Sequence, residues 1–321
     1  MMKLIDVYRM IIERGIESDP RGREEIDEGL EKQRSEFDKM DEDKKEFYDQ
    51  ERLWNPYADS RLSFGDPDTD LKKVIWGIDI GTGEVVLTDR LNQKGHGIDA
   101  IIGHHPIGKG RSIFPEVMSM QEGMYHELGI PINIAEGMMS KRIDEVTRAV
   151  MASNYNQVVD ACRLLEIPLM NAHTPTDNLA QQFMEIYLEE KSPRRLKDLV
   201  DAVFEIPEYR LAASGNSPPN IVYGKKDASV GKVAVKMTGG TSGPVEIYEK
   251  LADAGVGTVV GMHFPDKHID ECKKYHINVV VAGHMSSDSL GMNLAADMVE
   301  AGGVEVIPFS GFLRVSRNKD V

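Results

Sequence analysis

Four histidines each follow a short apolar segment whose composition predicts a buried β-strand. The segments are DAIIG (99–103), PLMNA (168–172), GTVVGM (257–262) and INVVVAG (277–283), and the histidines are His104, His173, His263 and His284. In sheets of parallel strands, loops and helix N-termini gather at the carboxyl ends of the strands, where ligands bind. A single histidine at such a position is more often structural than functional. Four of them together predict a shared site.

Two of these histidines are followed by an aspartate four residues later. The pairs are His173 with Asp177 and His284 with Asp288, and each aspartate falls where a helix is expected to begin. The fold would therefore place a carboxylate beside an imidazole at two separate strand ends. Imidazole and carboxylate together can bind a metal ion. The alternative is a hydrogen-bonded polar network that contains no metal.

A third unit is His104-His105-Pro106. Neighbouring residues of a strand point to opposite faces, but the turn favoured by the proline can bring both rings to one cavity. With the two His–Asp pairs, this unit supplies five or six ligands, more than the three or four of a single zinc ion. The number favours two ions about 3.5–4 Å apart, bridged by a carboxylate and a hydroxide.

The ligand types restrict the metal. Imidazole and carboxylate without thiolate suit Zn, Fe, Mn, Co or Ni as a divalent ion, and they disfavour Cu(I) and iron–sulfur clusters. The sequence does not distinguish among the five. We therefore expect two divalent metal ions per chain, of undetermined identity.

A glycine-rich segment is a second candidate site. Gly239, Gly240, Thr241, Ser242 and Gly243 join a predicted strand to a predicted helix that begins at residue 244. Their backbone N–H groups could hold an anion at the helix N-terminus. The alternative is a tight turn that needs small residues.

Short strands alternate with helices from residue 72 onward. The predicted strands are 72–80, 99–103, 131–137, 168–172, 233–237, 257–262, 277–283 and 304–309, with helices of about ten to sixteen residues between most of them. This alternation predicts an α/β fold with buried sheets covered by helices. We divide it into a first lobe (72–206), a connector (207–230) and a second lobe (231–321).

Residues 1–71 form an acidic, helical N-terminal extension in this interpretation. Residues 13–52 hold 16 acidic and 9 basic side chains, a net charge of −7. Their sparse apolar residues are spaced as in a helix. We expect a solvated surface, and the alternative is an arm that binds a partner.

Composition excludes several classes of protein. The 321 residues carry a formal net charge of −15, which would repel nucleic acid and anionic membranes. No segment approaches the ~18 consecutive apolar residues that span a bilayer. Only two cysteines are present, too few for a disulfide framework, so we expect reduced thiols in a cytoplasmic protein.

The segments IIGHHP, NAHTPTDN and AGHMSSD, in this order and with GGTSG ahead of the third, resemble the Nif-three-like (NGG-interacting-factor-like) proteins. Some members of that family are labelled GTP cyclohydrolase type-two homologues. The resemblance covers residues 72–321 and gives no information on residues 1–71. It implies a two-lobed α/β protein with a dinuclear metal site in the cleft between the lobes, assembled as a homo-oligomer, commonly a ring-shaped hexamer.

The resemblance also assigns roles to residues. The implied metal ligands are His104, His105, Asp177, His284 and Asp288. Asp288 departs from the family, which usually has Glu at this position, one methylene longer. The resemblance places His173 beside the metals, as a further ligand or as a proton carrier.

Two functions follow from these expectations. The first is a metal-dependent hydrolase that acts on a nucleotide-like or phosphorylated small molecule through a bridging hydroxide, with His173 or His263 carrying the proton. The second is a non-catalytic metal-binding or scaffold protein, because membership of a family does not establish an activity.

Overall fold

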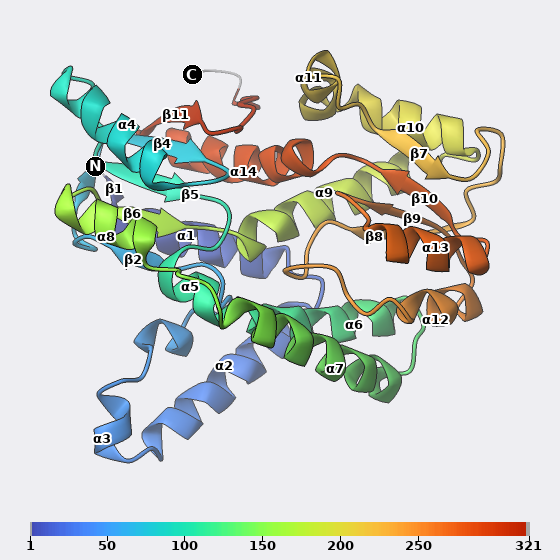
Figure 1. Cartoon of the computed structure of the whole chain (residues 1–321), viewed down its shortest axis with the longest axis horizontal. Helices are drawn as coiled ribbons and strands as arrows, with labels where there is room; N and C mark the ends of the chain where they lie inside the picture. The colour runs from blue at the N-terminus through green and yellow to red at the C-terminus, as the bar shows by residue number, and fades with distance from the viewer. Residues whose placement is uncertain (1, 319–321) are drawn as a thin grey trace.

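Two β-sheets and the helices around them form the fold of the computed structural model, which describes residues 2–318 (Figure 1). The first sheet has the order β11 (Glu305–Phe309), β4 (Lys73–Gly77), β5 (Ala100–Gly103), β6 (Leu169–Asn171) and β2 (Leu62–Phe64). The second has the order β7 (Asn220–Tyr223), β10 (Asn278–Val281), β9 (Val256–Gly261) and β8 (Lys232–Lys236). Within these two sheets, β2 and β7 run antiparallel to the strands they pair with, and the other strands are parallel. A short pair, β1 (Met2–Lys3) and β3 (Asp70–Leu71), lies beside them.

The helices cover these sheets. In chain order they are α1 (Leu4–Glu17), α2 (Arg23–Asp38), α3 (Glu42–Lys45), α4 (Thr82–Gln93), α5 (Gly108–Ile113), α6 (Met120–Glu127), α7 (Ile132–Val150), α8 (Gln157–Leu164), α9 (Thr174–Lys191), α10 (Leu196–Glu205), α11 (Pro207–Ser214), α12 (Ile247–Asp253), α13 (Asp266–Lys274) and α14 (His284–Ala301). Two 3₁₀ segments occur at Gln50–Leu53 and Phe114–Ser119. The predicted α/β class, with sheets buried under helices, is confirmed.

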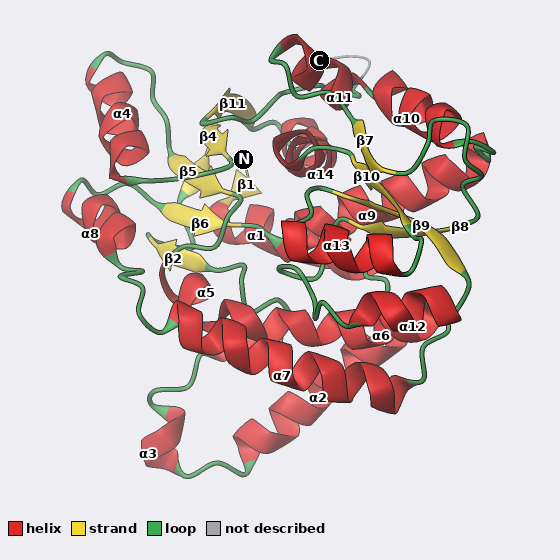
Figure 2. Cartoon of the chain, turned by 45° about the vertical axis from the view of Figure 1, so that its right-hand side comes forward, coloured by secondary structure: helices red, strands yellow, loops and turns green. Residues whose placement is uncertain are grey.

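Both faces of each sheet are buried, which explains the continuous apolar runs in the sequence. In the first sheet, Val74 and Trp76 point to a core shared with α1 and α14, whereas Ile75 points to a core shared with α4 and α8. Figure 2 shows α4 and α8 on one side of this sheet and α1 and α14 on the other. In the second sheet, Val259 packs toward α6, α7 and α12, and Val260 packs toward α9 and α10. The period of two along a strand distributes the side chains in this way.

Helices α9 and α14 connect the two sheets. Helix α9 follows β6 of the first sheet but buries Met184 against the second. Helix α14 follows β10 of the second sheet but buries Met292 against the first. The two helices pack so closely that a Cβ added at Gly291 would lie 2.0 Å from the carbonyl oxygen of Thr176. This crossing places the first turns of both helices side by side, between the sheets.

One predicted strand is wrong. Residues 131–137 belong to α7, which begins at Ile132. The apolar residues of this helix that are buried, Ala135, Met139, Val146 and Val150, recur at helical spacing. The apolar segment PINIA is short enough to suggest a strand, but its continuation buries only one helical face.

The structure also shows where the predicted lobe boundaries lie in the fold. The predicted connector, 207–230, contains α11 and β7, and β7 pairs with β10 at the edge of the second sheet. The strand expected at 304–309 forms as β11 but pairs with β4 of the first sheet. The last strand of the chain therefore returns to the sheet with which the alternation begins.

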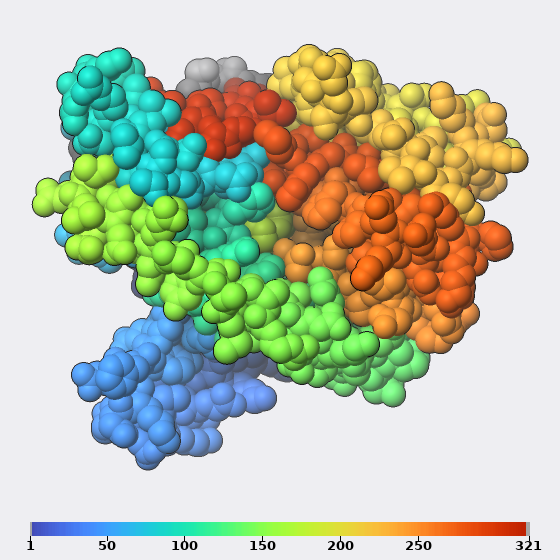
Figure 3. Space-filling view, viewed as in Figure 1, coloured from blue at the N-terminus to red at the C-terminus, as the bar shows by residue number. Residues whose placement is uncertain are grey.

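The N-terminal residues divide into a buried helix and a protruding arm. Helix α1 buries Leu4, Val7 and Ile11 completely in the core of the first sheet. Helices α2 and α3 extend away from the body (Figure 3), and α2 buries only Ile26 and Leu30. The solvated helices predicted from the charge pattern correspond to this arm. Among the helices of residues 2–318, none has the length and apolar character needed to cross a membrane.

Candidate metal centre

The carboxyl ends of the two sheets face each other, and the predicted site residues meet there. His104 and His105 follow β5, and their ring centroids are 5.1 Å apart. His173 follows β6 and lies 4.9 Å from His104. From the second sheet, His284 lies 5.4 Å from His105. The structure thus brings together imidazoles that are separated by up to 180 residues in the sequence.

The two aspartates reach the same point from the N-terminal parts of two helices: Asp177 lies in the first turn of α9, and Asp288 lies just after the first turn of α14. Asp177 and Asp288 are almost completely buried. The spacing of four residues places each on the same helical face as the preceding histidine, so that His173 Nε2 is 3.6 Å from Asp177 Oδ2. In the same way, His284 Nε2 is 3.6 Å from Asp288 Oδ2.

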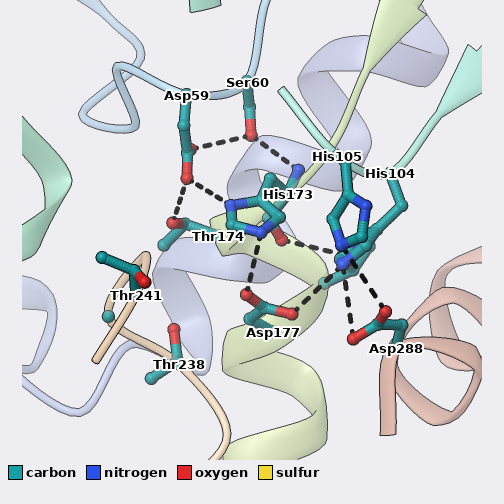
Figure 4. Close-up of polar contacts among 12 residues, drawn as sticks. Asp59, Ser60, His104, His105, His173, Thr174, Asp177, Thr238, Thr241 and Asp288 are labelled. Atoms are coloured by element: carbon teal, nitrogen blue, oxygen red, sulfur yellow. Dashed lines mark hydrogen bonds and ion pairs between the residues drawn. The ribbon is translucent and has the colours of Figure 1, made fainter. Parts of the chain in front are cut away.

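The separations between the ligand atoms are those expected around a cation. His104 Nε2 lies 3.5 Å from Asp177 Oδ1 and 3.6 Å from Asp288 Oδ1 (Figure 4). His105 Nε2 lies 3.7 Å from Asp288 Oδ2. These distances exceed those of hydrogen bonds. Two ligand atoms that each lie about 2.1 Å from a tetrahedral ion are about 3.4 Å apart, so the present arrangement leaves room for an ion.

The other nitrogen of two of these rings is already held by the protein. His104 Nδ1 lies 3.1 Å from the carbonyl oxygen of Ala172, which can only accept a hydrogen bond. His105 Nδ1 lies 2.7 Å from Asp79 Oδ1. With Nδ1 donating to these acceptors, Nε2 keeps its lone pair and points into the centre. This is the tautomer and orientation that metal-binding histidines require.

Several buried polar atoms at this point lack any hydrogen-bond partner within residues 2–318. They are His104 Nε2, Asp177 Oδ1, Asp288 Oδ1 and Asp288 Oδ2. A buried polar atom left without a partner costs about 1–3 kcal/mol. Bound cations would satisfy these four atoms, so the residues present fit a metal centre.

The electrostatics of the two carboxylates agree with this fit. Burial, together with the negative charges of Asp288 and Asp59, raises the pKa of Asp177 well above its usual value. Burial also raises the pKa of Asp288, but His104, His284 and His105 outweigh it, and the net pKa lies below the usual value. A cation beside Asp177 would remove the cost of ionising it.

Comparison with solved structures identifies relatives of this chain. A NIF3 superfamily protein from Sphaerobacter thermophilus is 31% identical, and the alignment covers 79% of this chain and 91% of that one with a TM-score of 0.69. This chain belongs to the NIF3 superfamily. The family predicted from the histidine motifs is thereby confirmed.

More distant structures match this NIF3 chain as well. Reduced HcgD from Methanocaldococcus jannaschii is 16% identical, with a TM-score of 0.48 and coverage of 77% of this chain and 87% of that one. The protein ybgI, described as of unknown function, is 14% identical, with a TM-score of 0.47 and coverage of 79% and 90%. No family model and no curated protein matches the sequence.

The centre contains one residue, Asp59, that the sequence did not predict to be there. Asp59, from the N-terminal segment, is fully buried, and its Oδ2 lies 2.7 Å from His173 Nδ1 and 2.6 Å from Thr174 Oγ1 (Figure 4). Ser60 Oγ accepts a hydrogen bond from the backbone N–H of His173. Burial raises the pKa of Asp59, but His173 and the hydrogen bonds from His173, Thr174 and Ser60 together hold it below the usual value.

No pattern in the sequence pointed to Asp59, because it follows no predicted strand and the resemblance began at residue 72. Asp79, the partner of His105, did carry a signal, since it lies at the end of the first predicted strand, 72–80. An acidic residue at the carboxyl end of a strand therefore predicts a site residue in the same way as a histidine does.

The predicted glycine-rich anion site does not form at a helix N-terminus. Helix α12 begins only at Ile247, and it is a short helix. The carbonyl oxygens of the loop, not its N–H groups, make the main contacts: Gln121 Nε2 donates to Gly239 O and Thr241 O, and Arg142 Nε donates to Ser242 O. Gly239 has a φ of +100°, and a Cβ there would lie 2.6 Å from Gln121, so a turn requires this glycine.

A cavity of about 970 Å³ opens beside the centre (Figure 3). His105, His173, Asp177, His284 and Asp288 line its inner end. His263, the remaining predicted histidine, also lines it, with its ring centroid 4.8 Å from that of His284. The glycine-rich loop forms part of another wall. The cavity is large enough for a small organic ligand.

Proposed function

We propose that the centre binds two divalent cations. His104, Asp177 and Asp288 form one group of potential ligands, and His105, His284 and Asp288 form another, each with ligand atoms within 4.8 Å of one another. Asp288 belongs to both groups: its Oδ1 faces His104 and its Oδ2 faces His105 and His284. An aspartate here can therefore bridge, although the family usually has a glutamate.

The observation that carries this proposal is the set of four unpartnered, buried ligand atoms on His104, Asp177 and Asp288. The absence of cysteine from the group favours Zn, Fe, Mn, Co or Ni.

We further propose that the protein is a hydrolase for a nucleotide-like or phosphorylated small molecule. Two divalent cations would supply Lewis-acid polarisation of the substrate and a water of lowered pKa. His173 and His263 lie beside the ligands and serve as proton carriers, with Asp59 fixing the ring of His173. The cavity beside the centre would hold the remainder of the substrate.

The test of the metal centre is elemental analysis of purified protein. We expect about two metal ions per chain in the wild type. Asp288→Asn should lower both, because Asp288 contacts both groups, whereas Asp177→Asn should lower mainly one. The matched control is Asp297→Asn, a buried aspartate on the same helix that pairs with Arg314. Equal metal contents in all four proteins would refute the proposal.

The test of hydrolysis is turnover of nucleotides, phosphoesters and purine amides by the metal-loaded protein. Product formation that disappears in Asp288→Asn but persists in Asp297→Asn is the expected result. If the metal is bound but none of these compounds is converted, the hydrolase proposal fails while the metal centre stands.

The second candidate function is a non-catalytic metal-binding or scaffold protein. The protruding arm of α2 and α3 favours it, because this acidic element contributes little to the core (Figure 3). Phe47, which follows α3, is 84% exposed. We also propose self-assembly into a ring hexamer, as the family resemblance implied, and sedimentation analysis of the full chain tests it.

Two buried free cysteines, Cys162 and Cys272, support a reducing, cytoplasmic location.

A further inference from the structure

One wall of the cavity lies at the end of β8 and carries a lysine. Within residues 2–318, no carboxylate pairs with this lysine. Lys236 ends β8, is half-buried and lines the cavity. Its Nζ donates to the hydroxyl of Tyr125 at 2.6 Å and lies 4.8 Å from the centroid of that ring. Within residues 2–318, no carboxylate oxygen lies within 4.0 Å of this Nζ. Acidic side chains outnumber basic ones in this chain, whose net charge is −15. A lysine without a carboxylate partner in a cavity therefore suggests that the cavity binds an anion.

A second cation lies on the same wall. Arg142 is held by its Nε, which donates to Ser242 O at 3.0 Å, and by a 3.2 Å contact between its NH1 and Glu145, which is 44% exposed. Both cations act on one buried ring: burial, Lys236, Arg142 and His263 lower the pKa of His268 to about 4. Lys236 and Arg142 therefore contribute to the same local potential.

Each acidic residue that lines the cavity already has a partner within the protein or belongs to the metal centre. Asp79 contacts His105, Glu84 accepts a hydrogen bond from the N–H of Gly81, and Glu145 contacts Arg142. Asp177 and Asp288 belong to the metal centre. Glu145 offsets part of the charge of Arg142, so Lys236 is the cation of this wall that, within residues 2–318, has no carboxylate partner and remains available to a ligand.

This wall is distinct from the metal centre. In the second sheet, Lys236 of β8 is in register with Gly261 of β9, which is in register with Val281 of β10, the strand that precedes His284. Two strand spacings separate β8 from β10, about 10 Å. Phe264, which is half-buried, lines the cavity as well, and aromatic rings of this kind stack on nucleobases.

We propose that Lys236 and Arg142 anchor the phosphate group of a nucleoside monophosphate whose other end reaches the metal centre. The proposal rests on the function proposed above and makes it more specific. In this proposal the phosphate is the anchor and not the reacting group.

The experiment measures binding of the four common nucleoside 5′-monophosphates to metal-depleted protein by calorimetry. At least one should bind the wild type, and Lys236→Met should weaken it by about tenfold to a hundredfold, the usual effect of losing a charged hydrogen bond. Lys236→Arg should restore most of the affinity. The matched control is Lys232→Met, an exposed lysine on the same strand that contacts Leu128 O and does not line the cavity, and its affinity should equal that of the wild type.

Several results would overturn the proposal. They are the absence of binding by all four nucleotides, binding that requires added metal, equal losses in Lys236→Met and Lys232→Met, and inorganic phosphate binding as tightly as the nucleotide. Thermal unfolding of each variant establishes that it is folded. Because the measurement uses metal-depleted protein, it can succeed even where elemental analysis disproves the metal centre.

Discussion

At the scale of single residues, each proposed ligand depends on a neighbour that holds it in place. Asp59 is such a neighbour: its side chain is fully buried, and within its own segment it accepts a hydrogen bond from Ser60 Oγ. It accepts hydrogen bonds from His173 Nδ1 and Thr174 Oγ1, 114 and 115 residues away in the sequence. A buried carboxylate with several donors is stable only while those donors stay in position.

We predict that Asp59→Ala destabilises the metal-depleted protein. The substitution leaves His173 Nδ1 and Thr174 Oγ1 without their acceptor in a buried site, at a cost of about 1–3 kcal/mol for each. Urea unfolding measures the loss. The control is Asp68→Ala, in the same N-terminal segment, where the side chain is 71% exposed and pairs only with Lys3, and where we expect a change within about 0.5 kcal/mol. Similar losses in both variants would contradict the role given to Asp59.

At the scale of elements, the centre depends on how closely α9 and α14 cross. Asp177 lies in the first turn of α9 and Asp288 just after the first turn of α14, and Gly291 faces Thr176 where the backbones approach. Without a Cβ at position 291, the helices can come close enough for both carboxylates to reach His104. The glycine therefore serves helix packing and the geometry of the site at once.

We predict that Gly291→Ala lowers both stability and metal content. Its Cβ would lie 2.0 Å from the carbonyl oxygen of Thr176, so the helices must move apart, and overpacking of this kind costs about 1–3 kcal/mol. Thermal unfolding and elemental analysis measure the two effects. Gly137→Ala is the matched control, because position 137 lies within α7 and has open space around its Cβ. Helix propensity predicts that this control gains about 0.5–1 kcal/mol.

At the scale of the whole molecule, the proposed ligands come from both sheets. His104 and His105 follow a strand of the first sheet, whereas His284 follows a strand of the second. Asp177 and Asp288 lie on the two helices that cross between the sheets. A bound cation would therefore connect distant parts of the chain, and unfolding would separate its ligands.

We predict that removal of the metal by a chelator lowers the thermal midpoint of the wild type. A ligand that binds only the folded state stabilises it by RT ln(1 + [L]/Kd), about 2.7 kcal/mol at a free concentration of 100 Kd. Calorimetric scans with and without chelator measure the shift. In Asp288→Asn the same treatment should change the midpoint little, whereas an equal shift in both proteins would place the stabilising metal elsewhere.

Much of the site was predictable from local patterns. The segments that precede His104, His173, His263 and His284 are short and mostly apolar, and the structure confirms a strand before each. The spacing of four residues between His173 and Asp177 predicted their shared helical face, because a helix repeats every 3.6 residues. These are properties of neighbouring residues, which the sequence contains directly.

The patterns failed where a segment depends on distant contacts. The apolar residues 131–137 suggested a strand but belong to α7, since the buried face extends to Val150. Likewise, no strand was predicted within the proposed connector 207–230, yet this segment contributes β7 to the second sheet. In both segments the structure depends on contacts with residues that are distant in the sequence.

The sequence by itself determined the α/β class, the family and the identity of the residues that gather at the strand ends. Only the tertiary structure decided that β11 returns to the first sheet, that Asp59 holds His173, and that Asp288 faces histidines from both sheets. The physical reason is that periodicity and residue type act between neighbours in the chain. Distances of a few ångströms between remote residues depend instead on how two sheets and two crossing helices pack.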